Sequence, residues 1–371
     1  MFYKQLILIT FLFFTFFAHA FDKVPGYAPV EIDPERLQLY GVTSQIVEIR
    51  NLTKTIRTVG IVTVDERRIS NIQTKFNGWI EKLYVNFTNE YVKKGDPLFQ
   101  VYSPELFSTQ EEYLLALKGT QRKIEGRFSE ELHKSDLELF MAAQKRLELW
   151  DVPIDEIKRL ENTQEASKTL LIRSPVNGVV THLNAFLGKD VMPGMNLYVI
   201  ADLSKIWILG DIYEQDIELV DLGQKAVLTL TSFPSEHVKK EITFIDYILD
   251  ESARTVKVRF ESDNFDFKLK PGMYGTVEIK KNMGRSLAIP EEAVIFTGKR
   301  KIVFVDKGHG YFEPRDVEIG FKADQYYQVI SGLSSGERVI TSSQFLIDSE
   351  SRLKGTESEN VEMLIEEESQ W

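Results

Sequence analysis

Alternating apolar and polar positions divide most of the chain into short predicted β-strands. The alternation is clearest in a pattern that occurs twice: Gly78-Trp-Ile-Glu-Lys-Leu83 returns as Gly178-Val-Val-Thr-His-Leu183. Further along, Val92-Lys-Lys-Gly95-Asp-Pro-Leu98-Phe99 returns as Val191-Met-Pro-Gly194-Met-Asn-Leu197-Tyr198, and one single-residue gap aligns both pairs. Each copy predicts a few short strands joined by tight turns, because alternation at a period of two is typical of a half-buried strand.

The two copies also agree at a turn. Asn89 in the first copy matches Gly188 in the second, and these two residue types enter left-handed backbone conformations most easily. Only two copies occur, which excludes a solenoid. Chance similarity between two β-hairpins is the alternative to a true repeat.

Between the copies, residues 103–168 are rich in Glu, Leu, Lys and Gln and predict a helical hairpin. Ser103-Pro104 is a good N-cap and first-turn pair, and Gly126 with Ser129 marks a turn and a new helix start. Pro153 restarts a third, short helix. The second helix carries an apolar stripe suited to packing on the first: Leu132, Leu139, Phe140, Ala143, Leu147 and Trp150.

After the second copy, alternating and β-branched segments separated by Gly and Pro predict a small barrel. Beyond a boundary at 282–285, further strands predict a second β module shared with residues 42–59. The acidic segment after Lys354 is predicted to be a mobile tail. The predicted domains are 21–58 with 285–353, the barrel 59–71 with 202–284, the sandwich 72–102 with 169–201, the hairpin 103–168, and the tail 354–371.

The N-terminus predicts export. Met1–Lys4 is followed by the apolar run Leu6–Phe17 and then by Ala18-His19-Ala20, a small-x-small cleavage pattern. The run has about 12 residues, whereas roughly 20 are needed to span a bilayer, which favours a cleaved signal peptide (residues 1–20) over an uncleaved anchor. We therefore expect an exported mature protein that begins at Phe21.

Composition narrows the function classes. The chain of 371 residues is 43% hydrophobic and 27% charged, which excludes a disordered chain, and its net charge of −11 argues against a nucleic-acid partner. It has no cysteine, which excludes disulfides, thiolate metal sites and Cys nucleophiles. The acidic pairs Glu111-Glu112 and Asp155-Glu156 are typical of solvated helix faces, and no phosphate loop or hydrolase motif occurs. The sequence offers no support for an enzyme.

This arrangement resembles the periplasmic adaptor subunits of tripartite efflux pumps, the HlyD-like membrane fusion proteins. Leu171-Ile-Arg-Ser-Pro-Val-Asn-Gly178 is similar to the start of the family's second half-sandwich, Ala201-Asp-Leu-Ser-Lys-Ile-Trp207 to its passage into the barrel, and Ile289-Pro-Glu-Glu-Ala-Val294 to its membrane-proximal domain. The resemblance covers about Gly26–Leu353. It implies an elongated, mainly β adaptor with an α-helical hairpin: a split lipoyl-like β-sandwich, a β-barrel and a membrane-proximal β domain.

Thr63-Val-Asp-Glu66 and Tyr102-Ser-Pro-Glu-Leu106 are most similar to the CusB-like branch, which serves heavy-metal pumps of the resistance-nodulation-division (RND) class. The resemblance implies a non-enzymatic protein without a cofactor that forms homo-oligomers, as hexamers, on an inner-membrane RND pump. It also implies a connection to an outer-membrane channel, with Cu(I) or Ag(I) as the transported ion. An adaptor for drug or organic-solute efflux, an adaptor for ABC-type secretion, and an exported binding protein are the alternatives.

One departure from this branch concerns the metal. CusB-like adaptors bind Cu(I) or Ag(I) through methionines near the mature N-terminus, whereas residues 21–60 here contain no Met, His or Cys. Soft Cu(I) selects thioether or thiolate ligands, so either the metal contact has moved or the adaptor does not touch the ion. The nearest candidates are Met192 and Met195, with His182 on the preceding strand. Packing of the turn is the alternative role for the two methionines.

The hairpin has two further implications. A lipoyl or biotin carrier would present one lysine on a tight turn between the two half-sandwiches, and the helical insertion occupies that place. The resemblance implies that the hairpin turn, Gly126, Arg127 and Ser129, faces the outer-membrane channel, while the module around Ile289–Leu346 lies on the pump.

The junctions between modules are a separate matter. Because the chain crosses each junction twice and few side chains need be buried there, flexible two-strand linkers are expected.

Overall fold

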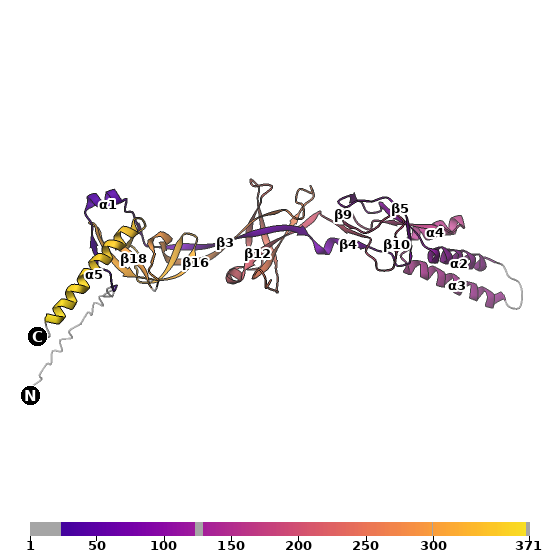
Figure 1. Cartoon of the computed structure of the whole chain (residues 1–371). Coiled ribbons are helices and arrows are strands. Elements are labelled where there is room, and N and C mark those ends of the chain that lie inside the picture. The colour runs from indigo at the N-terminus through magenta and orange to yellow at the C-terminus, as the bar shows by residue number, and fades with distance from the viewer. Residues whose placement is uncertain (1–23, 123–128, 299, 369–371) are drawn as a thin grey trace, which may run out of the picture. The chain divides into compact units, whose positions relative to one another are not determined.

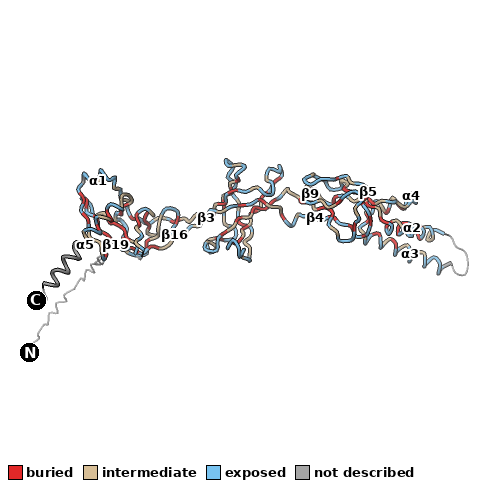
Figure 2. Tube along the Cα trace, viewed as in Figure 1, coloured by how far each residue is buried: buried red, intermediate tan, exposed pale blue. Residues whose placement is uncertain are grey.

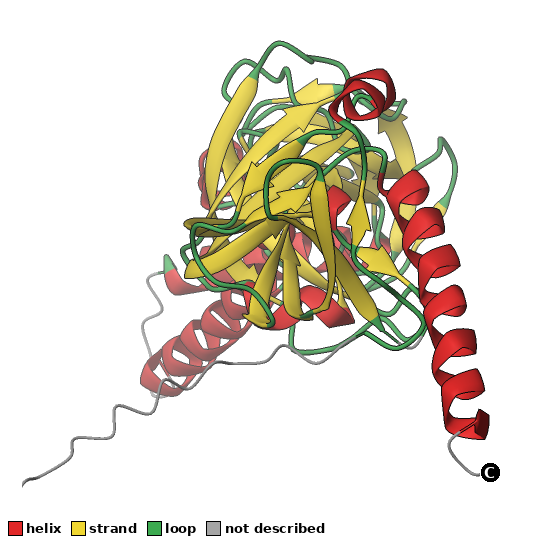
Figure 3. Ribbon diagram, turned by 90° about the vertical axis from the view of Figure 1, so that its left-hand side faces the viewer, coloured by secondary structure: helices red, strands yellow, loops and turns green. Residues whose placement is uncertain are grey.

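The structure, a computed structural model, describes residues 24–122, 129–298 and 300–368 (Figure 1). The predicted signal peptide and hairpin residues Gly126 and Arg127 lie outside these ranges. The chain divides into two compact units: a central unit, Arg57–Glu278, and a terminal unit, Met1–Ile56 with Ile279–Trp371. Strands make up most of the secondary structure (Figure 3), which confirms the mainly β fold class.

Two four-stranded sheets form a sandwich in the central unit, and each sheet draws strands from both copies of the repeat. The sheets have the orders β10-β5-β7-β8 and β4-β11-β9-β6. Val191 pairs with Gly78, and Val92 pairs with Gly178, so the short strand after each turn adds to the opposite copy. The repeated pattern is thus a structural repeat. The strands are β4 (Ile69–Ile72), β5 (Gly78–Leu83), β6 (Tyr91–Val92), β7 (Pro97–Tyr102), β8 (Thr169–Arg173), β9 (Gly178–Leu183), β10 (Asp190–Val191) and β11 (Tyr198–Ala201).

Turns and core of the sandwich follow the sequence pattern. Asn89 and Gly188 have φ values of 67° and 78°, which confirms the predicted left-handed turns. Phe99 of β7 stacks on Tyr198 of β11 with ring centroids 5.5 Å apart, and both side chains are fully buried. The Tyr198 hydroxyl donates a hydrogen bond to the Val85 carbonyl oxygen at 2.7 Å. Figure 2 shows the buried residues of this core continuing into the adjoining helices.

Three helices occupy the segment between the copies, as predicted: α2 (Pro104–Thr120), α3 (Ser129–Leu149) and α4 (Ile154–Thr163). The Ser103 hydroxyl caps α2 by accepting a hydrogen bond from the Leu106 amide at 3.2 Å. The apolar stripe of α3 packs only in its second half. Ala143 and Leu147 are buried in the core that the helices share with the sandwich.

The prediction was wrong for the first part of that stripe, because Leu132 and Leu139 are 50% and 59% exposed. Near the end of α2, Gly119 lies directly against the Asp136 side chain of α3. Leu132 therefore lies beyond the last turn of α2, and Leu139 lies on a side of α3 that α2 leaves uncovered. Periodicity gave the correct helix, but it could not show where the partner helix ends.

A barrel completes the central unit. Its strands follow the order β13-β14-β15-β12-β3-β16, and an additional pairing of β13 with β16 closes the sheet. Gly60 of β3 lies opposite Gly210 of β12, and a Cβ atom at Gly60 would lie 2.6 Å from the Val277 side chain. Glycine thus makes room for a core valine. The elements are β3 (Glu48–Val64), η1 (Glu66–Arg68), β12 (Lys205–Tyr213), η2 (Glu214–Leu219), β13 (Lys225–Leu230), β14 (His237–Ile245), β15 (Thr255–Asp263) and β16 (Tyr274–Pro290).

The terminal unit contains a sheet of order β1-β19-β18-β22-β2, with β17 paired to β18. In addition, the end of β16 pairs with β21, and β21 pairs with β20. Its described elements are β1 (Val30–Glu31), α1 (Pro34–Tyr40), β2 (Ser44–Ile46), η3 (Glu291–Ala293), β17 (Ile295–Phe296), β18 (Lys301–Asp306), β19 (Tyr311–Asp316), β20 (Glu318–Ala323), β21 (Tyr326–Ser331), β22 (Arg338–Ile340) and α5 (Gln344–Glu368).

The predicted acidic tail differs from expectation, since α5 continues through most of it to Glu368. The helix is held at its start, where Ile347 is fully buried and the Ser351 hydroxyl donates a hydrogen bond to the Ala28 carbonyl oxygen at 2.6 Å. A helix that is nucleated by such tertiary contacts can extend through a charged segment that would not form one alone.

Candidate functional site

The helical hairpin takes the place of a loop between the two halves of the sandwich. β7 ends at Tyr102 and β8 begins at Thr169, and these two residues lie opposite each other in one sheet. The helices therefore leave and rejoin the sandwich at a single pair of strands. A lysine-bearing turn of the carrier kind has no place at this end of the sandwich.

Hydrogen bonds hold the base of the hairpin. Gln110 of α2 makes two hydrogen bonds with the backbone of Ser167, at 2.9 and 3.3 Å. The Tyr113 hydroxyl donates to the Glu161 carboxylate of α4 at 2.6 Å, and burial together with this carboxylate raises the pKa of Tyr113. These contacts join α2 to α4 and to the segment that leads back into the sandwich. The base of the hairpin is thus a fixed platform.

The far end of the hairpin carries exposed apolar side chains. Ser129 begins α3, and the described residues after it include Leu132, Leu137 and Met141, which are 50%, 43% and 51% exposed. They lie on more than one side of α3, because residues five and nine positions apart point in different directions from a helix. The predicted channel contact at Gly126, Arg127 and Ser129 stays a prediction.

The second Gly turn holds the predicted metal ligands, Met192 and Met195. The Met195 amide donates a hydrogen bond to the Met192 carbonyl oxygen at 3.1 Å, which closes the turn. Met192 is 52% exposed, whereas Met195 packs against the sandwich core. His182 lies on β9, opposite Val199. Within the described ranges, no three His, Asp or Glu side chains form a group that could hold a metal ion. A metal-binding role of the two methionines stays a prediction.

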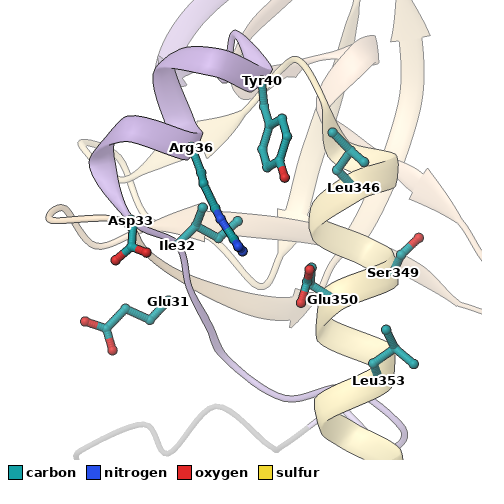
Figure 4. Close-up of a pocket in the computed structure, with 9 residues that line it drawn as sticks. All are labelled: Glu31, Ile32, Asp33, Arg36, Tyr40, Leu346, Ser349, Glu350 and Leu353. Carbon is teal, nitrogen blue, oxygen red and sulfur yellow. The ribbon is translucent and has the colours of Figure 1, made fainter.

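Sequence reasoning missed a pocket in the terminal unit, between α1 and α5. Its volume is about 150 Å³, and Figure 4 shows its lining. Leu346 and Leu353 supply apolar surface from α5, and Glu31, Asp33 and Glu350 supply carboxylates. Arg36 extends from α1 toward α5 (Figure 4). No sequence signal could have found the pocket, because its two walls come from opposite ends of the chain.

An exposed apolar surface adjoins this pocket. Leu39 near the end of α1 and Phe345 near the start of α5 are each 80% exposed. The Ser343 hydroxyl donates a hydrogen bond to the Tyr40 carbonyl oxygen at 2.6 Å, so the end of α1 lies beside the start of α5. None of the helices in the described ranges is long and apolar enough to cross a bilayer.

A sandwich that is split by a helical hairpin, together with a barrel and a further β module, defines the class of periplasmic adaptors, or membrane fusion proteins. Three family models match in chain order: the CusB barrel-sandwich hybrid domain at residues 69–201, the CusB-like beta-barrel domain at 205–283, and the CzcB C-terminal circularly permuted SH3-like domain at 287–348. The chain belongs to the CusB-like family of heavy-metal membrane fusion adaptors.

Two curated relatives span most of the chain. The cation efflux system protein CusB of Escherichia coli is 30% identical over 348 residues, which cover 90% of this chain and 80% of that protein. The putative membrane fusion protein SilB of Salmonella typhimurium is 28% identical over 345 residues, which cover 90% of this chain and 76% of that protein.

A solved structure has the same fold. A MacA–MexA chimeric protein that contains the α-hairpin domain of Pseudomonas aeruginosa MexA matches with a TM-score of 0.52 and 20% identity. The match covers 79% of this chain and 97% of that chain. At this identity the likeness shows the fold alone.

Proposed function

We propose that this protein is the periplasmic adaptor of a tripartite RND efflux system that exports Cu(I) or Ag(I). The observation that carries the proposal is the sandwich split between Tyr102 and Thr169 by a helical hairpin, in a chain 30% identical to a cation efflux protein over nearly its whole length. The adaptor performs no catalytic step. It holds an inner-membrane pump and an outer-membrane channel together.

The location and assembly follow from this role. Cleavage after Ala20 would release the mature chain into the periplasm, where homo-oligomers, as hexamers, would surround the pump. The exposed apolar side chains of α3 supply a surface for the channel at the far end of the hairpin.

The terminal unit supplies the contact with the pump. Leu39 and Phe345 present apolar surface, and the carboxylates of Glu31, Asp33 and Glu350 line the pocket beside it. Apolar anchors bordered by charge are the usual form of a specific protein interface. Because acidic groups outnumber Arg36 here, the matching surface of the pump carries basic side chains.

Deletion of the gene tests the function. We expect the deletion strain to lose tolerance to copper and silver and to recover it when the gene is supplied in trans. Growth with zinc, cobalt and cadmium is the control, since a 23% identical relative is named a cobalt-zinc-cadmium resistance protein of Cupriavidus metallidurans. Loss of tolerance to those three ions alone would contradict the assignment to Cu(I) and Ag(I).

Crosslinking tests the orientation. The chain has no cysteine, so a single introduced cysteine is unambiguous. Glu130→Cys, at the exposed start of α3, should crosslink to the outer-membrane channel, and Glu350→Cys in the α1–α5 pocket should crosslink to the pump. Exclusive crosslinks from Glu130→Cys to the pump would contradict the proposed orientation.

A further inference from the structure

The junction between sandwich and barrel is built differently from the flexible two-strand linker that the sequence suggested. The β4–β11 ladder of the sandwich ends at the pair Ile69 and Ala201, and the β3–β12 ladder of the barrel ends at the pair Val64 and Ile206. Only residues 65–68 and 202–205 lie between the two ladders. Relative motion of two domains is the default expectation unless contacts between them restrict it.

Arg68 joins the two segments that cross the junction, residues 65–68 and 202–205. Its guanidinium lies 2.5 Å from the Asp202 carboxylate and 3.3 Å from the Ser204 hydroxyl, and its carbonyl oxygen accepts a hydrogen bond from the Asp202 amide at 3.1 Å. The backbone and the side chain of Arg68 therefore both hold residues 202–204 in place. The ion pair is only partly exposed, at 35% and 30% of the two side chains, so solvent screens it less than a surface pair.

Arg67 links residues 65–68 to the barrel. Its guanidinium donates to the Asp65 carboxylate at 2.8 and 2.9 Å and to Glu261 of β15 at 2.9 Å, and it lies 5.4 Å from the ring centre of Trp207 on β12. The Asp65 side chain is 2% exposed. A buried carboxylate that is held by a forked guanidinium is strongly oriented.

A barrel loop spans the same junction from another side. The side chain of Asn264, which is 2% exposed, donates hydrogen bonds to the carbonyl oxygens of Leu203 and Leu269 at 2.9 and 2.8 Å. In the loop so formed, Phe267 has a φ of 53°, a left-handed conformation that is costly for an aromatic residue. Its ring meets Tyr91 of the sandwich edge-on, with centroids 5.7 Å apart.

From these three sets of contacts we propose that the sandwich and barrel of this chain move as one rigid lever, locked by the Arg68–Asp202 pair and the Tyr91–Phe267 contact. The rigid lever goes beyond the adaptor assignment. Its use in efflux rests on the proposed function. In that role, movement imposed on the barrel is transmitted to the hairpin without loss at this junction.

Spin-label distances in the full mature chain test the proposal. Cysteines at Lys93 in the sandwich and Lys225 in the barrel are exposed, and the chain offers no competing thiol. We expect a narrow distance distribution, and at least a twofold broader one in the Arg68→Gln, Phe267→Ala double variant. Each single variant should give an intermediate width, which keeps the test valid if the double variant fails to fold.

Lys257→Gln is the matched control. It breaks the Lys257–Asp211 ion pair, which is 2.8 Å long, similarly exposed and wholly within the barrel, and it should leave the distribution narrow. A broad distribution in the parent protein, or equal widths in parent and Arg68→Gln, would overturn the lever. Copper tolerance of cells carrying the double variant is measured separately, so failure of the adaptor assignment is distinguishable from failure of the rigid junction.

Discussion

Gly78 and Gly178 occupy equivalent positions in the two halves of the sandwich. Each begins the first strand of its copy, and each lies directly against the carbonyl group of the last residue of a closing strand, Tyr102 and Ala201 respectively. A Cβ atom at either glycine would collide with that carbonyl oxygen. The same steric requirement thus appears twice in one domain, as expected for two copies of one structural unit.

We expect Gly178→Ala to destabilise the sandwich. The new Cβ atom would lie 2.5 Å from the Ala201 carbonyl oxygen, which the β-ladder holds in place, so a loss of about 3 kcal/mol in the free energy of unfolding is expected. Gly194→Ala is the control, because its Cβ would meet nothing within 4 Å and only the φ of 83° opposes it, at about 1 kcal/mol. Urea unfolding measures both. Equal losses would contradict the close-approach argument.

The carboxylates at the junction make stability sensitive to acid. Hydrogen bonding to Arg67 lowers the pKa of Asp65 against an opposing effect of burial. Burial raises the pKa of Asp202, but hydrogen bonds from Ser204 and Arg68 outweigh it, and that pKa is lowered as well. Such carboxyls stabilise the fold above their ordinary pKa of 3.8, and the contribution is lost as the pH falls through the lowered pKa of the folded state.

The free energy of unfolding should therefore fall as the pH is lowered below 3.8, and it should fall less steeply in Asp202→Asn than in the parent. Denaturant unfolding at a series of pH values from 7 downward provides the measurement. Identical slopes for Asp202→Asn and the parent would show that the junction carboxylate does not contribute.

Phe345→Glu should weaken binding to the pump. The side chain is 80% exposed, so the fold loses little, but a charge would enter the apolar part of the proposed contact. We expect the Kd for the detergent-solubilised pump to rise at least about tenfold, which corresponds to about 1.4 kcal/mol. Leu222→Glu, on a 65% exposed barrel residue, is the control. An unchanged Kd for Phe345→Glu would place the pump contact elsewhere.

Metal binding by the adaptor itself is decided by an anaerobic titration of the mature chain, residues 21–371, with Cu(I) or Ag(I) against a competing chelator. If the adaptor takes up the ion, we expect the Met192→Ile, Met195→Ile double variant to lose binding, because residues 21–60 offer no soft ligand. Met273→Ile, in the barrel, is the control. Absence of binding by the parent would mean that the pump alone selects the ion.

The order of the modules and the helical insertion were readable from the sequence, because their signals are local. The repeat around Gly78 and Gly178 appears as a period-two pattern, and the Ser103-Pro104 cap marks the helix start that the structure confirms. The left-handed turns at Asn89 and Gly188 follow from residue type alone. By contrast, the metal role of Met192 and Met195 rests on chemistry that no contact in the structure tests.

The sequence by itself thus determined a mainly β chain with a helical hairpin between two similar half-domains, since backbone propensity and apolar periodicity act over neighbouring residues. Only the tertiary structure decided that Leu132 lies beyond the end of its partner helix, that α1 and α5 enclose a pocket, and that Arg68 meets Asp202 at the junction. The pocket and the Arg68–Asp202 pair join residues far apart in the chain. Such pairings depend on how whole elements pack, and packing leaves no periodic trace in the order of the residues.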